Sequence, residues 1–252
     1  ESLVSIIVPM YNAALYLSET LDSIKDQTHT KWECLLIDDG STDSTAEISK
    51  SYTSTDSRFS YHQQKNAGPS AARNNGLWMA KGSFIQFFDA DDVMAPQLLE
   101  TLLKAYQKAN DKTVLFSSML IGDHDNIQRT KPTNRGFGEG RALGFNEFYA
   151  KFGIDFLFIP GTVLFPATAL KDVWWNERSS FSEDFEFYLS VAKRGFHFRN
   201  VAQPLTIYRD SPNSLSKQTA NTAQANYDIY LRWLIKGNQY VYARRCAHQF
   251  HR

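Results

Sequence analysis

Short apolar segments alternate with amphipathic segments through the first half of the chain, and this alternation restricts the possible folds more than any other feature. The apolar runs, which we expect to be strands, are residues 3–9, 32–37, 59–63, 83–88 and 113–120. The segments between them, which we expect to be helices, are residues 15–24, 71–80 and 97–109, with Ser70 as a cap before 71–80, and a helix that ends near residue 52 after a cap at Ser41, Asp43 or Ser44. Strand–helix alternation predicts an α/β fold, a Rossmann-like open and mostly parallel sheet flanked by helices on both faces.

The second half of the chain is less regular. Residues 123–144 are polar and glycine-rich, and predict a long loop or an irregular hairpin. Beyond them we expect strands at 162–165, 196–201 and 205–208, and helices at 145–152, 185–194 and 220–235. Because no segment has the composition of a linker, we expect one continuous core.

Polar clusters follow three of the predicted strands directly. They are Tyr11–Asn12, Asp38–Asp39 and the run from Asp89 to Asp92. Ligands of open α/β sheets gather beyond the carboxyl ends of the strands. We therefore expect the three clusters to converge on one edge and to form a binding site.

Asp89 and Asp91 are expected on the same side of an extended segment at the end of a strand. Two adjacent carboxylates repel each other unless a cation lies between them, and a hard divalent cation with open positions for phosphate oxygens meets that need. A polar loop whose aspartates cap the helix after Gln97 is the alternative. The position directly after the strand at 83–88 favours the cation site.

Other candidate residues have equally simple alternatives. Asp38 and Asp39 could accept hydrogen bonds from a base or ribose, or could belong to an ordinary strand-to-helix turn. Arg73, near a helix start, could pair with a diphosphate or lie in solvent. The pair Glu183–Asp184 could supply a general base, or could compensate the dipole of the helix that follows.

Taken together and in order, these segments resemble a known family. Residues 4–12 (VSIIVPMYN), 37–43 (IDDGSTD), 66–74 (NAGPSAARN) and 88–92 (FDADD) closely resemble family 2 of the glycosyltransferases, which have the GT-A fold. Residues 182–188 (SEDFEFY) and 208–216 (YRDSPNSLS) are similar to two later motifs of that family. The resemblance covers about residues 3–216, and the combination is far more specific than any single motif.

The resemblance implies an inverting transfer of a sugar from a nucleoside diphosphate donor, a UDP-sugar above all, to a hydroxyl of a glycan or lipid-linked saccharide, as in polysaccharide biosynthesis of the cell envelope. By position, Pro9, Tyr11 and Asp39 would hold the nucleobase. Arg73 would lie near the nucleotide or its phosphates, and Asp89 would contact the ribose.

The remaining motif residues would carry the chemistry. By the same resemblance, Asp91 would bind a divalent metal ion, manganese or magnesium, that neutralises the leaving diphosphate. Asp184 would be the general base that deprotonates the acceptor hydroxyl, and Glu183 beside it would belong to the substrate site. Many relatives have a histidine shortly after the Tyr–Arg pair, whereas Asp210 follows Arg209 here and either it or water would take that place.

The resemblance also implies a division of the chain. A GT-A domain would span residues 1–216, with a nucleotide-sugar-binding half at 1–120 and an acceptor-side half at 121–216. A helical extension would follow at 217–252. The aromatic residues of the acceptor side could stack on sugars, although we expect most to pack in the core; they are Trp174, Trp175, Phe181 and Phe185.

Charge and hydropathy exclude several classes of protein. With 27 acidic and 27 basic residues, the chain lacks the basic excess typical of nucleic-acid binders. Its apolar runs fall short of the roughly 18 residues needed to span a bilayer, and its two distant cysteines favour a reducing compartment. We expect a cytoplasmic protein. The basic, aromatic tail at 240–252 could rest on the inner face of the membrane or form a solvated helix end.

Two rival functions remain open at this point. Asp89–Val93 also matches the DxDxV signature of haloacid-dehalogenase-like phosphatases, but in those enzymes the motif follows the first strand. A nucleotide-sugar-binding module without catalytic activity would explain the missing histidine. The presence of Asp91 and Asp184 favours an enzyme over such a module.

Overall fold

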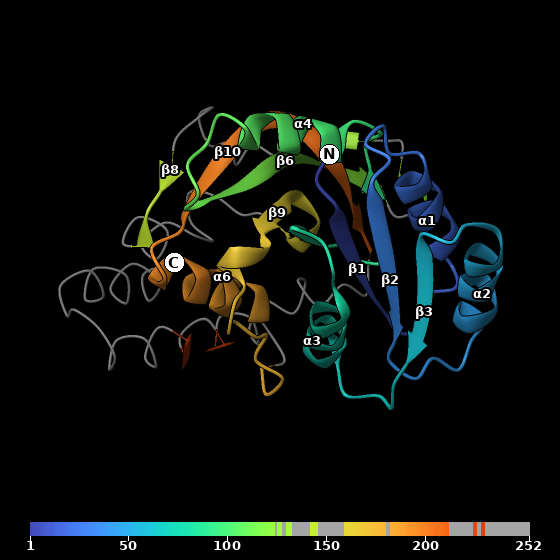
Figure 1. Ribbon diagram of the computed structural model, residues 1–252. Coiled ribbons are helices and arrows are strands. Elements are labelled where there is room, and N and C mark those ends of the chain that lie inside the picture. The colour runs from blue at the N-terminus through green and yellow to red at the C-terminus, as the bar shows by residue number, and fades with distance from the viewer. Residues whose placement is uncertain are drawn as a thin grey trace.

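The computed structural model describes residues 1–123, 125–127, 130–132, 142–145, 159–179, 182–211, 224–225 and 228–229. Within these residues, one sheet has the strand order β3-β2-β1-β4-β9-β6-β10-β5, with β7 paired to β6 and β8 paired to β10. Figure 1 shows this sheet curving through the molecule with helices against it. The predicted α/β fold class is confirmed.

The first four main strands form the parallel part of the sheet. They are β1 (Val4–Met10), β2 (Trp32–Asp38), β3 (Phe59–Gln63) and β4 (Phe84–Phe87). β1 pairs in parallel with both β2 and β4, and β2 pairs in parallel with β3. The carboxyl ends of these strands therefore share one edge, as the sequence predicts.

The other part of the sheet is mixed rather than parallel. β9 (Val163–Pro166) lies antiparallel between β4 and β6 (Thr113–Asp123), and β6 pairs in parallel with β10 (His197–Asp210). Three two- or three-residue strands, β5 (Val93–Met94), β7 (Thr130–Pro132) and β8 (Ala142–Leu143), pair antiparallel with their neighbours. Two 3-10 turns, η1 (Pro160–Thr162) and η2 (Ala167–Ala169), flank β9.

Helices cover both faces of the sheet (Figure 1). On one face lie α1 (Leu17–Lys25), α2 (Thr45–Thr55) and α4 (Leu98–Tyr106), packed against side chains such as Val4, Ile6 and Val8 of β1. On the other lie α3 (Pro69–Met79) and α6 (Glu183–Lys193), packed against Ile7, Ile37 and Phe87. Because successive strand residues point to opposite faces, both faces of these strands are apolar, which explains their continuous hydrophobic composition.

Two local predictions are wrong. The strands expected at 196–201 and 205–208 are one strand, β10, whose pairing with β6 shifts register on either side of Pro204, a residue without an N–H to donate. Ser70 does not cap α3: the helix begins at Pro69, with Gly68 before it at a φ of 92°. Proline suits the first helical position because its fixed φ is already helical.

Several predictions lie wholly or mostly outside the described residues. They are the helices at 145–152 and 220–235, the ring of Phe181 and the tail at 240–252. The division of the chain into domains at 120 and 216 stays a prediction, and position 120 falls inside β6. None of the described helices is long and apolar enough to cross a membrane.

Candidate active site

A buried arginine joins the two halves of the chain. Arg73 lies in α3 with only 5% of its surface exposed. Its Nη2 donates to Oδ1 of Asp89 at 2.9 Å, and its Nη1 donates to Oε1 of Glu183 at 3.1 Å. Burial lowers the pKa of Arg73, but the two carboxylates outweigh that effect and raise it above its usual range. Arg73 therefore stays charged and fixes the turn after β4 next to the start of α6.

The acidic segment after β4 is a tight turn rather than the extended segment we expected. The N–H of Asp92 donates to the carbonyl of Asp89 at 3.3 Å and closes the turn. Thr20 of α1 holds the turn, because the Thr20 hydroxyl lies 3.0 Å from the carbonyl oxygen of Ala90 and 2.9 Å from the carbonyl oxygen of Asp92. Asp91 is at the tip of this turn. Burial raises the pKa of Asp91 to about 6, and the charge of Asp89 contributes in the same direction.

Arg209, at the end of β10, holds the same turn from the other side. Its Nε donates to the carbonyl oxygen of Asp91 at 2.9 Å, and its backbone N–H donates to Oδ1 of Asp92 at 3.0 Å. Its guanidinium also pairs with Glu19 of α1 and lies 4.0 Å from the ring centre of Tyr16. The sequence marks Arg209 only as part of a motif; nothing in its local pattern indicates these partners.

Asp184 lies in the first turn of α6, between Glu183 and Phe185. Burial raises the pKa of Asp184 to about 7, and the neighbouring charge of Glu183 raises it too. The N–H of Phe185, which donates to Oδ1 of Asp184 at 2.7 Å, and the charge of Arg73 act in the opposite direction. A carboxyl group whose pKa lies near neutrality has the proton affinity required of a general base.

The residues predicted to hold the base lie at the same edge. Pro9 is half-buried near the end of β1, and Tyr11, just beyond it, is 55% exposed. Asp39 is buried, and its carboxylate accepts hydrogen bonds of 2.8 Å from Gln64 Nε2 and from the backbone N–H groups of Ala67 and Gly68. Its observed contacts hold the loop before α3. A role of these three residues in base binding stays a prediction.

The predicted convergence of the polar clusters is confirmed. The N–H of Asp39 donates to the carbonyl of Met10 at 2.8 Å, which joins the ends of β1 and β2. Asn12 accepts from the N–H of Thr42 at 2.9 Å, and its own N–H donates to Ser41 Oγ at 3.0 Å. Asp38, also buried, accepts from the hydroxyl of Tyr61 at 2.6 Å.

The acidic turn fits a divalent cation shared with a diphosphate. Among the residues the structure describes, no three His, Cys, Asp or Glu side chains are grouped as a protein-only metal cage would require. Magnesium-like ions bound with substrate phosphates use only one or two carboxylates and several waters. Asp89 and Asp91 provide such a pair. Burial is the main cause of the raised pKa of Asp91, and the like charge of Asp89, which a cation would offset, adds to it. Asp210, the candidate for the place of the expected histidine, is exposed at the end of β10.

Of the acceptor-side aromatic residues whose side chains the structure describes, two are buried in the core and one is exposed. Trp175 and Phe185 are buried in the core, and the ring of Trp175 stacks on Phe187 at 4.2 Å and lies 4.5 Å from the guanidinium of Arg73. Trp174, in contrast, is 52% exposed.

Comparison with known proteins agrees with the fold and the motifs. A family model described as Glycosyl transferase family 2 matches residues 5–174. TuaG of Bacillus subtilis, whose assigned role as a teichuronic acid biosynthesis glycosyltransferase is itself provisional, is 29% identical over 232 residues, which cover 91% of this chain and 88% of TuaG. The chain spans only 19%, 63% and 22% of three other curated glycosyltransferase relatives.

Solved structures share the fold at low sequence identity. Staphylococcus aureus TarS 1–349 in complex with UDP-GlcNAc has a TM-score of 0.73 and 20% identity, with 93% of this chain and 67% of that chain covered. The mannosyltransferase PcManGT of Pyrobaculum calidifontis, in complex with GDP-Man and Mn2+, has a TM-score of 0.70 and 18% identity, with 93% and 65% covered. The GT-A architecture predicted from the motifs is thus confirmed.

Proposed function

The chain belongs to glycosyl transferase family 2, and we propose on that ground that it transfers a sugar, with inversion, from a nucleoside diphosphate donor to a hydroxyl of a saccharide acceptor. A UDP-sugar is the donor we favour, since the TarS fold relative binds UDP-GlcNAc. The acceptor is a glycan or lipid-linked saccharide of the cell envelope, in keeping with the name of the relative TuaG.

The observation that carries this proposal is the Arg73 bridge. Asp89 belongs to the predicted donor side and Glu183 to the predicted acceptor side, 110 residues from Arg73 in the chain, yet both bind the same guanidinium. The acidic turn and the start of α6 therefore lie together, as a reaction between two bound substrates requires.

On the donor side, we propose that Asp91 holds a divalent cation, manganese or magnesium, together with the diphosphate, and that Asp89 binds the ribose. Bound there, the cation would supply charge neutralisation for the leaving diphosphate. Arg209 and Thr20 keep the turn in place, so the backbone that carries Asp91 is held before the donor arrives. Pro9, Tyr11 and Asp39 surround the base in this proposal, with exposed Tyr11 free to stack on it.

On the acceptor side, we propose that Asp184 takes the proton of the acceptor hydroxyl as that oxygen attacks the anomeric carbon. Its raised pKa supports this role. Burial and the negative charge of Glu183 both raise the pKa of Asp184. The hydrogen bond from Arg73 holds Glu183 in place. Attack from the side opposite the diphosphate gives the inverted product.

The phosphatase hypothesis is wrong, because the chain belongs to a glycosyltransferase family and the DxDxV segment follows β4 rather than the first strand. A binding module without activity remains as an outcome of the test below. Contact of the tail at 240–252 with the cytoplasmic face of a membrane is part of the proposal and lies outside the described residues.

The test is release of nucleoside diphosphate from a panel of UDP- and GDP-sugars in the presence of Mn2+ and mixed oligosaccharide acceptors. Wild type should turn over at least one donor, and the anomeric configuration of the product, read by NMR, should be inverted. Asp184→Asn should lower kcat by at least about 100-fold, since general-base catalysis contributes about 100- to 10,000-fold, and should leave the Kd of the donor unchanged.

Asp111→Asn provides the matched control, because Asp111 is an exposed carboxylate before β6, at the opposite edge of the sheet. It should keep wild-type turnover. Near wild-type rates in Asp184→Asn would remove Asp184 as the base. Donor binding without turnover of any sugar in the panel would favour the inactive binding module.

A further inference from the structure

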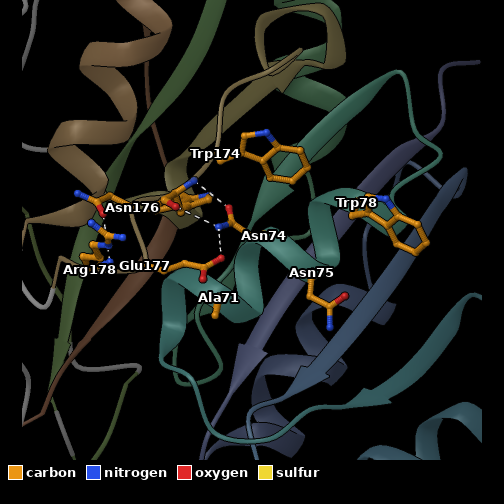
Figure 2. Close-up of a pocket in the computed structure, with 9 residues that line it drawn as sticks. Ala71, Asn74, Asn75, Trp78, Trp174, Asn176, Glu177 and Arg178 are labelled. Atoms are coloured by element: carbon orange, nitrogen blue, oxygen red, sulfur yellow. Dashed lines mark hydrogen bonds between the residues drawn. The ribbon is translucent and has the colours of Figure 1, made fainter.

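A hollow lies on the outer side of α3, where that helix meets the segment before α6 (Figure 2). Its volume is about 530 Å³, within the range of about 300–1,000 Å³ that is usual for ligand sites. We call it the tryptophan hollow, and its lining residues are Ala71, Asn74, Asn75, Trp78, Trp174, Trp175, Asn176, Glu177 and Arg178. None of them belongs to the proposed catalytic set.

Two tryptophans that line this hollow are more than half exposed. Trp78, on α3, is 76% exposed and Trp174 is 52% exposed. Tryptophan is usually well buried in folded proteins, and exposed large aromatics that share a concave surface commonly mark binding sites. Figure 2 shows the two rings on separate elements, at the edge of the same hollow.

The floor of the hollow is rigid. The side chain of Asn74 donates to the carbonyl oxygen of Trp175 at 3.0 Å and to Glu177 Oε1 at 2.8 Å, and it accepts from the N–H of Trp175 at 2.8 Å. Asn176 Nδ2 donates to Glu186 Oε2 of α6 at 2.8 Å. These contacts fix the segment directly after Trp174, from Trp175 to Glu177, so the backbone that carries the exposed ring is tied to α3 and α6 on that side.

The chemistry of the lining matches that of a sugar. One face of a pyranose ring presents several C–H groups, which pack on the electron-rich face of an indole. The same hollow is lined by Asn75, Glu177 and Arg178, whose amide, carboxylate and guanidinium can donate to or accept from hydroxyls. Exposed indole rings together with such polar groups suit a saccharide better than a purely apolar ligand.

We propose that the tryptophan hollow is a saccharide-binding site separate from the catalytic site, and that it holds a sugar unit of the glycan on which the enzyme acts. This inference rests on the proposed function for the identity of that glycan. Trp175 lies between the two sites, since Asn74 binds its backbone on the side of the hollow while its buried ring lies over Arg73. A glycan long enough to pass this segment could occupy both sites, and its distal units would add to acceptor affinity.

The test follows tryptophan emission of the full chain during titration with three neutral probes, cellotetraose, chitotetraose and maltotetraose, without any donor. At least one probe should give a saturable change that UDP with Mn2+ does not displace. Trp78→Ala and Trp174→Ala should each weaken that binding about tenfold, the equivalent of about 1.4 kcal/mol. Leu15→Ala is the control, because Leu15 is 78% exposed and lies outside the hollow, and it should bind as wild type does.

Three results would overturn the inference. The first is no response to any of the three probes, and the second is binding that survives both tryptophan substitutions. The third is a wild-type dimer that Trp78→Ala converts to a monomer in sedimentation analysis, because this face would then be an interface between two copies of the chain. Calorimetry of UDP with the same proteins separates this inference from the proposed function. Nucleotide binding without saccharide binding defeats the inference alone, whereas saccharide binding without nucleotide binding defeats the proposed function.

Discussion

The guanidinium of Arg73 neutralises two carboxylates that would otherwise repel each other inside the protein. Asp89 and Glu183 both bind it, whereas Asp184 has no comparable ion-pair partner among the described residues and keeps a pKa of about 7. Burial, together with the charge of Glu183, raises the pKa of Asp184, whereas Glu183 is held by its ion pair with Arg73. On this basis we propose a positioning role for Glu183 and a proton-accepting role for Asp184.

The pH dependence of transfer should follow this arrangement. Asp184 acts only when deprotonated, so kcat/KM for the acceptor should rise with pH and level off above a pKa near 7. Glu183→Gln removes a negative neighbour that raises this pKa. Its profile, measured with saturating donor and Mn2+, should therefore reach its plateau at lower pH than that of wild type.

Asp111→Asn is again the control, and its profile should coincide with that of wild type. A profile that does not change between pH 5.5 and 8, or a shift of the Glu183→Gln profile to higher pH, would contradict the assignment of Asp184 as base.

Among the helices, α3 approaches the sheet so closely that one of its residues cannot have a side chain. A Cβ at Gly76 would lie 2.4 Å from Cγ2 of Ile7, on β1. In an ordinary helix interior, replacing glycine by alanine stabilises by about 0.5–1 kcal/mol. Here we expect the substitution to destabilise the fold instead, because the added methyl would push α3 away from β1. Overpacking of this kind costs about 1–3 kcal/mol of folding stability.

Gly76→Ala should accordingly lower the Tm in thermal unfolding by several degrees, given about 2–4 °C per kcal/mol for a chain of this size. Ser51→Ala, at an exposed position of α2, is the helix control and should leave the Tm nearly unchanged. A Gly76→Ala protein as stable as wild type would show that α3 does not approach β1 as closely as described.

Elements with a strong local pattern could be predicted from the sequence, and elements set by distant pairing could not. β1, β2 and β4 are continuous apolar runs, so their composition alone predicts buried strands. β10 continues through an exposed stretch around Pro204 because it pairs with β6, and the two-residue strand β5 exists only through pairing with β10. Neither strand pairing produces a local sequence pattern that could have predicted it.

Over the whole molecule, the candidate site is assembled from both halves of the chain. The sequence predicted which clusters would meet at the carboxyl edge, because parallel strands place their ends together. It could not predict the contacts that tie the halves to each other, Arg73 with Glu183 and Arg209 with Glu19, whose partners lie 110 and 190 residues apart. The sequence named Trp174 as a ring that could stack on a sugar but could not predict the tryptophan hollow, because Trp78 and Trp174 line one hollow only in the folded chain.

The proposed reaction depends on Asp91 and a divalent cation binding the donor diphosphate together at this edge. Calorimetric titration of the full chain with UDP and with GDP, in Mn2+ and then in excess chelator, tests it most directly, with Asp91→Asn and Asp111→Asn compared under both conditions.

At least one nucleotide should bind wild type and Asp111→Asn in Mn2+, chelator should abolish this binding, and Asp91→Asn should not bind in either condition. Binding of equal strength in chelator, or an Asp91→Asn protein that binds as wild type does, would contradict this dependence on Asp91 and the cation.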